Sequence, residues 1–359
     1  MLLFLGAGSS KAFGIPDTRG FIAEFEAVIG ENEIYTKIKK TIPKEFLDME
    51  TLMTILDDLS KTEDELLNSI APHTTRFILA NSSDIPYLIK DEDLKSSCRE
   101  LLLNIKRVIR TKCLNVVSSD RMEVLNQYDA FFGALEIGKG VSASDTSRMQ
   151  YPVLKIFTTN YDTCIETYFN SRRVDLSRGA VDRFSEYVFD VDSFSTSNKN
   201  VELVKLHGSI DLFVQDKKIR FLPGAGAIDT TARTYLGDEY GREFMIYPVE
   251  SSTSTEMFQS PHIELLHIFR DRLMKSDTWI IIGSTFRDST LTSIMNDVLI
   301  HKAEIQHPVV IHINPEAKHI NTYLSNKGYK ALSDIIKPID MGFMDEKVGI
   351  ALKSIRLRG

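Results

Sequence analysis

The stretch MLLFLGAGSS, residues 1–10, decides the fold class of this chain. Residues 2–5 form a short apolar run, and Gly6-Ala7-Gly8 follows it directly. A continuous apolar run that ends in a glycine-rich turn is typical of a buried parallel strand. Ser9 and Ser10 are favourable N-cap residues, so we expect an α-helix to begin after the turn.

Apolar runs of strand length return in the second half of the chain and alternate there with helical patterns. The predicted strands are Val153–Thr158, Glu202–Leu206, Trp279–Ile282 and Val309–Ile313, and the predicted helices are Asp162–Phe169, Ile263–Met274, Ser289–Ile300 and Lys318–Lys327. This alternation predicts an α/β fold with a Rossmann-like parallel sheet and helices on both faces. Ligands of such sheets bind beyond the carboxyl ends of the strands, where the strand order reverses.

Residues 21–149 have a different character, because strand signals are scarce and helical periodicity dominates. Apolar side chains recur on one helical face along residues 49–59, 94–109 and 122–135. We therefore expect an inserted helical lobe of residues 21–149. The Rossmann-like domain would then consist of residues 1–20 and 150–359. Polar and glycine-rich stretches at residues 193–200 and 224–241 are expected to be surface loops.

The composition excludes several classes of protein. The chain has 359 residues, of which 43% are apolar, and its formal net charge of −7 does not favour direct binding to nucleic acid. Three cysteines, Cys98, Cys113 and Cys164, are too few for a four-cysteine zinc site, and their sparse, odd number fits reduced thiols. Membrane spans need about 18 consecutive apolar residues, which the chain lacks. We expect a cytoplasmic protein with no metal site.

Two segments near the N-terminus indicate a phosphate site. Gly6 and Gly8 permit a close approach of the backbone, and a following helix would direct N–H groups at a diphosphate. Lys11 stands where the usual dinucleotide fingerprint has a third glycine, which argues against a hydride-transfer enzyme. In the segment GIPDTR, residues 14–19, the arginine is placed to reach a phosphate or to pair with the aspartate two residues before it.

Polar side chains follow two neighbouring predicted strands. In TNYD, residues 159–162, the Asn160 amide donates and accepts hydrogen bonds and so suits a ribose hydroxyl or an ordered water. Asp162 is expected to cap the next helix and hold the loop. His207 follows the next strand, where a histidine can accept a proton near neutral pH, and Gly208 would leave room for a ligand beside the ring.

These motifs together resemble the sirtuin family, in which a Gly-Ala-Gly loop and a Gly-Ile-Pro-Asp segment surround NAD. TNYD is similar to the sirtuin Thr-Gln-Asn-Ile-Asp segment, with one residue fewer before the amide, and His207-Gly208 is similar to the sirtuin His-Gly pair. Gly283-Ser284-Thr285 and Ile313-Asn314 resemble the sirtuin segments near phosphate and the adenine ribose. Thr18 stands where sirtuins usually have a phenylalanine that screens nicotinamide.

A zinc-free sirtuin core with a helical insertion resembles the NAD-hydrolysing domains of prokaryotic antiphage systems, such as Thoeris effectors and HerA-associated sirtuin-like proteins. The resemblance implies that NAD is the substrate, that no zinc is needed, and that Asn160 and His207 form the catalytic pair. The residues it implies in NAD binding are Gly6, Ala7, Gly8, Ser9, Pro16, Asp17, Thr18, Arg19, Asp162, Gly208, Gly283, Ser284, Thr285 and Asn314. The products would be ADP-ribose and nicotinamide.

The same resemblance implies control of the activity through assembly. We expect a homo-oligomer and a separate sensing partner, with a HerA-type ATPase as the first candidate. The segment YPVE, residues 247–250, is also typical of these antiphage domains. Two other functions stay open: a zinc-independent protein deacylase or ADP-ribosyltransferase, and a non-catalytic subunit that binds NAD or ADP-ribose.

Overall fold

The computed structural model contains two compact units. It describes residues 1–44, 46–61, 72–81, 92–114, 121–134, 154–183, 186–196, 199, 201–216, 218–221, 242–247, 259–303, 308–343, 345 and 347–348. The sheet unit comprises Met1–Ile15, Val116–Met245 and Ser260–Gly359. The helical unit comprises Pro16–Asn115 and Ile246–Gln259.

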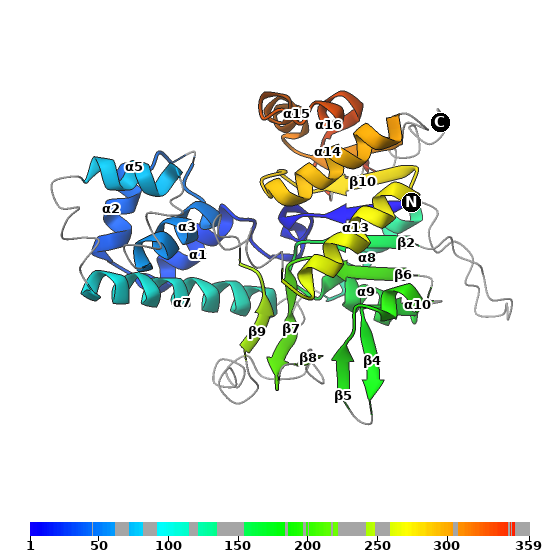
Figure 1. Cartoon of the computed structure of the whole chain (residues 1–359), viewed down its shortest axis with the longest axis horizontal. Helices are drawn as coiled ribbons and strands as arrows, with labels where there is room; N and C mark the ends of the chain where they lie inside the picture. Colours follow the sequence, from blue (N-terminus) through cyan, green and yellow to red (C-terminus); the bar gives the residue numbers. More distant parts are fainter. Residues whose placement is uncertain are drawn as a thin grey trace, which may run out of the picture. The chain divides into compact units, whose positions relative to one another are not determined.

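The sheet unit is built on a seven-stranded parallel sheet in the order β12-β11-β10-β1-β2-β6-β3 (Figure 1). Its strands are β1 (Leu2–Leu5), β2 (Leu154–Thr158), β3 (Leu176–Ser177), β6 (Val201–Lys205), β10 (Thr278–Ile282), β11 (Val309–Asn314) and β12 (Ile336–Asp340). The predicted strands agree with these bounds to within one residue. The apolar runs are unbroken in β1 and over Trp279–Ile282 of β10, whose residues there are all buried, as expected for parallel strands covered on both faces.

The strand order reverses next to β1. From β1 the chain continues through β2 to β6 on one side, whereas β10, β11 and β12 are added in sequence on the other side. The point between β1 and β10 is therefore the topological switch point, where open α/β sheets bind ligands at their carboxyl edge. The loops after β1 and β10 are the glycine-containing segments that begin at Gly6 and Gly283.

Helices flank the parallel sheet and confirm the predicted α/β architecture. In the sheet unit they are α8 (Arg121–Ala134), α9 (Cys164–Ser171), α10 (Ser193–Thr196), α13 (His262–Lys275), α14 (Ser289–Ala303), α15 (Ala317–Asn326) and α16 (Lys330–Ile335). Aromatic rings connect α8 to α9, since Tyr128 and Phe132 both pack on Tyr168 with ring centroids 5.1 Å apart. The predicted helices at residues 162–169, 263–274, 289–300 and 318–327 correspond to α9, α13, α14 and α15.

A second sheet of five antiparallel strands also belongs to the sheet unit, in the order β4-β5-β8-β7-β9. Its strands are β4 (Ala180–Arg183), β5 (Glu186–Phe189), β7 (Gly208–Gln215), β8 (Lys218–Phe221) and β9 (Arg242–Met245). The sequence did not predict this sheet, because its strands are short and mix charged with apolar residues. β7 begins at Gly208, so this second sheet continues directly from the histidine motif.

The helical unit contains α1 (Gly20–Ile29), α2 (Glu33–Thr41), α3 (Met49–Ser60), α5 (Pro72–Ala80) and α7 (Glu92–Leu114). α3 packs against α7, and the predicted apolar stripes supply the core: Leu52, Leu56, Cys98 and Ile105 are each 0% exposed. Cys98 is therefore a buried core residue, as expected. Burial raises the pKa of its thiol to about 12.

Three local expectations differ from the structure. The first turn is followed by two short 3-10 helices, Ala7–Ser9 and Lys11–Phe13, and not by the expected α-helix. The hydroxyl groups of Ser9 and Ser10 do not cap a helix, because they donate to Gly6 O and Asp162 Oδ2. The predicted surface loop at 193–200 contains α10. The helical unit begins at residue 16 and ends its first segment at 115, so α8 lies in the sheet unit rather than in the expected lobe of residues 21–149. The predicted loop at 224–241 lies outside the described residues.

Candidate active site

The register of the parallel sheet places the predicted motifs at one edge. Leu5 pairs with Thr158 and with Ile282, and Thr158 pairs with Lys205. Each of these residues ends its strand or lies level with an end. Asn160 lies two residues after Thr158, and His207 lies two residues after Lys205. These two residues are therefore also level with each other at the carboxyl edge of the sheet. The edge thus collects the loops that the sequence motifs identify.

The loops after β1 and β10 pack backbone against backbone. Gly8 N–H donates to Gly283 C=O at 3.0 Å, and a Cβ built on Gly283 would lie 2.3 Å from Ser9 N. Gly6 also lies close to this loop, because its Cβ would lie 2.8 Å from Gly283 O. The glycines of this motif thus allow two loops to meet at the switch point, a role that the sequence interpretation did not assign to them.

Asn160 ties its own loop to the loop after β1. Its Nδ2 donates to Gly6 O at 3.0 Å, Ser9 Oγ at 3.1 Å and Ser10 Oγ at 2.8 Å. Within the described residues, the Oδ1 atom of this amide makes no hydrogen bond. Asn160 therefore has one polar atom fixed in the loop and one acceptor left for a ligand.

Asp162 holds the same loop from its other side, as the sequence predicted. Its Oδ2 accepts from Ser10 Oγ at 2.7 Å, and its Oδ1 accepts from Cys164 N at 3.0 Å, at the start of α9. The side chain is 5% exposed. Both carboxylate oxygens are thus used for structure, so Asp162 acts as a loop anchor.

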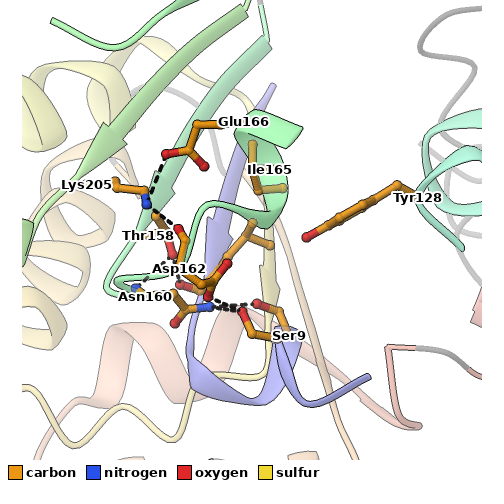
Figure 2. A pocket seen from close by; sticks show the side chains of 10 residues that line it. Ser9, Tyr128, Thr158, Asn160, Asp162, Ile165, Glu166 and Lys205 are labelled. Atoms are coloured by element: carbon orange, nitrogen blue, oxygen red, sulfur yellow. Dashed lines mark hydrogen bonds and ion pairs between the residues drawn. The ribbon is translucent and has the colours of Figure 1, made fainter. Parts of the chain in front are cut away.

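A cavity borders this pair of loops, as Figure 2 shows. Its lining residues are Leu5, Ser9, Ser10, Tyr128, Thr158, Asn160, Asp162, Ile165, Glu166 and Lys205. Three residues predicted at the NAD site, Ser9, Asn160 and Asp162, line it together. His207 and Gly283 do not belong to its lining, so the cavity covers the β1–β2 part of the predicted site only.

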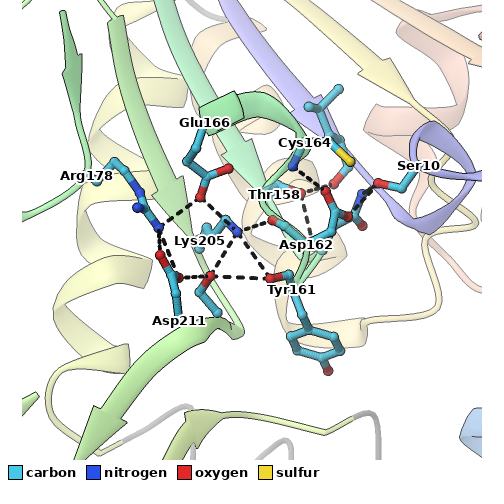
Figure 3. Close-up of polar contacts among 12 residues, drawn as sticks. Ser10, Thr158, Tyr161, Asp162, Cys164, Glu166, Arg178, Lys205 and Asp211 are labelled. Carbon is cyan, nitrogen blue, oxygen red and sulfur yellow. Dashed lines mark hydrogen bonds and ion pairs between the residues drawn. The ribbon is translucent and has the colours of Figure 1, made fainter. Parts of the chain in front are cut away.

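A buried charge network contacts the loop after β2 through the backbone of Tyr161 and Asp162 (Figure 3). Lys205 Nζ lies 3.0 Å from Glu166 Oε1 and donates to the backbone oxygens of Tyr161 and Asp162. Arg178 joins the network by contacting Glu166 Oε1 at 2.9 Å and Asp211 Oδ2 at 2.8 Å. Burial opposes the charge of Asp211, but Arg178 and Lys205 outweigh it and hold the pKa of this carboxyl at about 2. The loop therefore rests on fixed, paired charges.

His207 has a carboxylate partner that the sequence interpretation missed. Its Nε2 lies 2.9 Å from Asp288 Oδ2, and its side chain is 9% exposed. Asp288 comes directly before α14 and accepts from Leu291 N at 2.9 Å, so it caps that helix. An Asp before a predicted helix was a visible cap signal. Its contact with His207, 81 residues away, was not visible in the sequence.

Gly208 allows the backbone after His207 to pack against β9, and it does not leave room for a ligand. Its φ is +80°, and a Cβ at this position would lie 2.0 Å from Phe244 O in β9. The space beside the glycine is therefore filled by backbone of the second sheet, which corrects the expectation that it admits a ligand. The left-handed conformation and the close contact both restrict the position to glycine.

The adenine-side motifs are joined to each other. Ser284 O accepts from Asn314 Nδ2 at 3.1 Å and from His312 Nε2 at 2.9 Å, and Asn314 Oδ1 accepts from Glu316 N. Thr285 is exposed. Asn314 and His312 therefore position the loop after β10, and a direct contact of Asn314 with a ribose stays a prediction.

The segment at residues 14–19 is divided between the units: Gly14 and Ile15 belong to the sheet unit, and Pro16 to Arg19 belong to the helical unit. Asp17 Oδ1 accepts from Gly20 N at 2.8 Å and so holds the start of α1, while Thr18 O accepts from Met49 N at 2.9 Å. Arg19 is exposed. The predicted contacts of these residues with NAD stay predictions.

Two buried histidines predict sensitivity to acid. Burial lowers the pKa of His262 to about 4, with the neighbouring His207 adding to the effect, and burial also lowers the pKa of His312 to about 4. The unfolded chain takes up protons on these rings below about pH 6.5, but the folded chain does not. The stability that these two neutral rings contribute is therefore present above about pH 6.5, and it is lost as the pH falls toward 4.

We expect the free energy of unfolding, measured with urea, to fall by about 1 kcal/mol per histidine for each pH unit between pH 6.5 and 5. Carboxylates stay largely ionised in this window. Replacing His312 with glutamine should make the dependence shallower, whereas His301→Gln, at an exposed position on α14, should leave it unchanged. A free energy of unfolding that stays constant from pH 6.5 to 5 would contradict this account.

Within the described residues, no helix is long and apolar enough to cross a membrane. The same part of the chain contains no group of three or more His, Cys, Asp or Glu side chains arranged to hold a metal ion.

Comparison with known families identifies the domain. Residues 154–332 match the family model described as SIR2-like domain. The match includes Asn160, His207, Gly283 and Asn314, together with the newly found Asp288, and it begins after the loop at Gly6. Comparison with curated proteins gives no match. A SIR2-like domain implies NAD binding and an NAD-utilising enzyme, and the Rossmann-like sheet agrees with it: the chain contains a sirtuin-like domain.

Proposed function

We propose that this chain is an NAD hydrolase that cleaves the bond between nicotinamide and ribose. The observation that carries the proposal is the level position of Asn160 and His207 at the ends of adjacent strands, with Asp288 bound to the histidine. An acceptor amide and a paired imidazole at one sheet edge suit the activation of water beside a sugar. The SIR2-like domain supports NAD as the substrate.

The proposed reaction consumes NAD and one water. The C–N bond between ribose and nicotinamide breaks, its electron pair goes to the ring nitrogen, and nicotinamide leaves as a neutral molecule. The water oxygen forms the new bond to the ribose carbon and releases one proton. Because the leaving group is cationic at the start, it needs little acid assistance, and the transition state is oxocarbenium-like, as in other glycoside cleavages.

Two side chains would perform the chemistry. Asn160 Oδ1 would accept a hydrogen bond from the attacking water or a ribose hydroxyl, because its Nδ2 is already held by Gly6, Ser9 and Ser10. His207 would accept the proton of the water or hydroxyl. The remainder of NAD would occupy the carboxyl edge at the switch point, near the loops that begin at Gly6 and Gly283.

We further propose that the hydrolase depletes NAD as an antiphage effector in the cytoplasm and is switched on by oligomerisation or by a separate protein. A HerA-type ATPase is the first candidate partner. An NADase without control would deplete NAD in its own host, so a regulated site is expected.

A protein deacylase or ADP-ribosyltransferase is the second candidate. Protein-deacylating sirtuins usually carry a four-cysteine zinc module, whereas this chain has only three cysteines, Cys98, Cys113 and Cys164, and all three are buried. A non-catalytic NAD-binding subunit is the third candidate. The His207–Asp288 pair favours an enzyme over that subunit, because binding alone does not require a paired base.

To distinguish these three functions, the pure protein is incubated with NAD, with and without a HerA-type ATPase, and the products are separated by chromatography. A hydrolase releases nicotinamide and ADP-ribose in equal amounts with water alone. A deacylase or transferase releases nicotinamide only when an acylated peptide or protein acceptor is added. Nicotinamide release in none of these conditions would favour the binding subunit.

A further inference from the structure

We propose that Asp288 is a positioning residue that fixes the orientation and the tautomer of the His207 ring. This inference rests on the proposed function, because it assigns a role to a partner of the proposed base. The contact joins His207 Nε2 to Asp288 Oδ2 at 2.9 Å. The side chains are only 9% and 18% exposed, respectively, so solvent competes little for this hydrogen bond.

The loop from β10 to α14 holds the Asp288 carboxylate rigidly. Its Oδ1 accepts from Leu291 N at 2.9 Å, and Thr292 Oγ1 donates to the backbone oxygen of Asp288 at 2.7 Å. The second carboxylate oxygen is not used by this cap and meets the histidine. Burial opposes the negative charge, but the hydrogen bond from His207 and the helix N–H groups outweigh it, so the pKa of Asp288 lies below its usual value.

This geometry determines which ring nitrogen can act as a base. An ionised carboxylate accepts hydrogen bonds only, so neutral His207 must keep its proton on Nε2. Nδ1 then carries the lone pair and is the atom that would take the proton from water or a ribose hydroxyl. Once protonated, the imidazolium lies against the carboxylate, as in other acid–base triads, here with the two nitrogens exchanged. Buried His262 is the neighbouring titratable ring, and it carries no charge at neutral pH.

An aspartate at a helix N-cap usually serves the helix alone, so the test must separate the two roles. Asn and Ser are both good N-caps, and Asp288→Asn and Asp288→Ser therefore keep α14 capped while removing the negative charge. Asp48 provides the matched control: it caps α3 by accepting from Thr51 N at 2.9 Å, the same distance, and belongs to the helical unit. Asp48→Asn should leave NAD turnover unchanged.

We expect Asp288→Asn and Asp288→Ser to lower kcat for NAD cleavage by about 10²-fold or more, with KM within about threefold of the original value. Turnover is measured under the conditions that activate the unaltered chain. A kcat within threefold of that chain in both variants, with thermal unfolding showing that they are folded, would overturn the proposal.

The second readout needs no NAD. In protein labelled with ¹⁵N-histidine, two-bond ¹H–¹⁵N correlation spectra at pH 8 report the tautomer of His207, whose signals are assigned by their loss in His207→Ala. We expect protonation on Nε2 in the unaltered chain and a shift toward the Nδ1 tautomer in Asp288→Asn. An unchanged tautomer would overturn the inference. Because this measurement does not depend on turnover, failure of the proposed hydrolase activity is recognised separately.

Discussion

Replacing His207 with alanine is expected to lower kcat for NAD cleavage by about 10²–10⁴-fold, which is the usual contribution of a general base. The variant loses the proton acceptor but keeps the amide of Asn160 and the loops at the switch point. KM should therefore change much less than kcat. Nicotinamide release, followed by chromatography under activating conditions, gives both values.

The matched control for this prediction is His301→Ala. His301 lies on α14 of the same unit, but its side chain is 56% exposed, and none of the predicted motifs includes it. Its replacement should leave kcat within about twofold of the original value, since surface substitutions rarely disturb a fold. If His207→Ala retained full turnover, the assignment of the base would be wrong.

The second large effect is expected from Gly283→Ala, which should destabilise the chain by about 2–5 kcal/mol. Gly283 has φ +64°, a conformation that costs an alanine about 1–2 kcal/mol. In addition, the new methyl group would lie 2.3 Å from Ser9 N and 2.5 Å from Gly8 C, so backbone must shift at a further cost of about 1–3 kcal/mol. The shift would displace the loop that binds the Asn160 amide, so NAD turnover should fall as well.

Gly328→Ala separates the two causes. Gly328 has φ +86°, similar to Gly283, but no atom lies within 4 Å of a Cβ placed there. This control should lose only the conformational part, about 1–2 kcal/mol, and keep its turnover. Urea unfolding measures both free energies. Equal losses of stability in the two variants would show that the contact between the loops after β1 and β10 is not restrictive.

Most of the parallel sheet was predictable because its buried strands are short and mainly apolar, and Trp279 to Ile282 forms an unbroken apolar run. β12 has no such run, since Lys337 and Pro338 interrupt it at the edge of the sheet, and the sequence did not predict it. The antiparallel sheet was missed for a related reason. Strands as short and mixed as Lys218–Phe221 resemble loops until their partners are known.

The sequence could predict those site residues that lie directly after a single strand. Asn160 and His207 stand out because each follows an apolar run, and strand ends meet at one edge of a parallel sheet. The partners of these residues depend on tertiary contacts instead. Ser10 was expected to cap a helix but bonds to Asp162, 152 residues away, and Asp288, which the sequence analysis did not single out, contacts His207. Local sequence rules contain no information about such pairs.

The level register of β1, β2, β6 and β10 has a consequence for how this chain tolerates change in length. Because Thr158 and Lys205 pair directly, one residue deleted between Thr158 and Asn160 would withdraw the amide by about 3.3 Å relative to the histidine. Loops elsewhere accept insertions at little entropic cost. The short segments that lead from Thr158 to Asn160 and from Lys205 to His207 therefore set the relative height of the amide and the imidazole. Their length is more tightly constrained than the identity of the residue between.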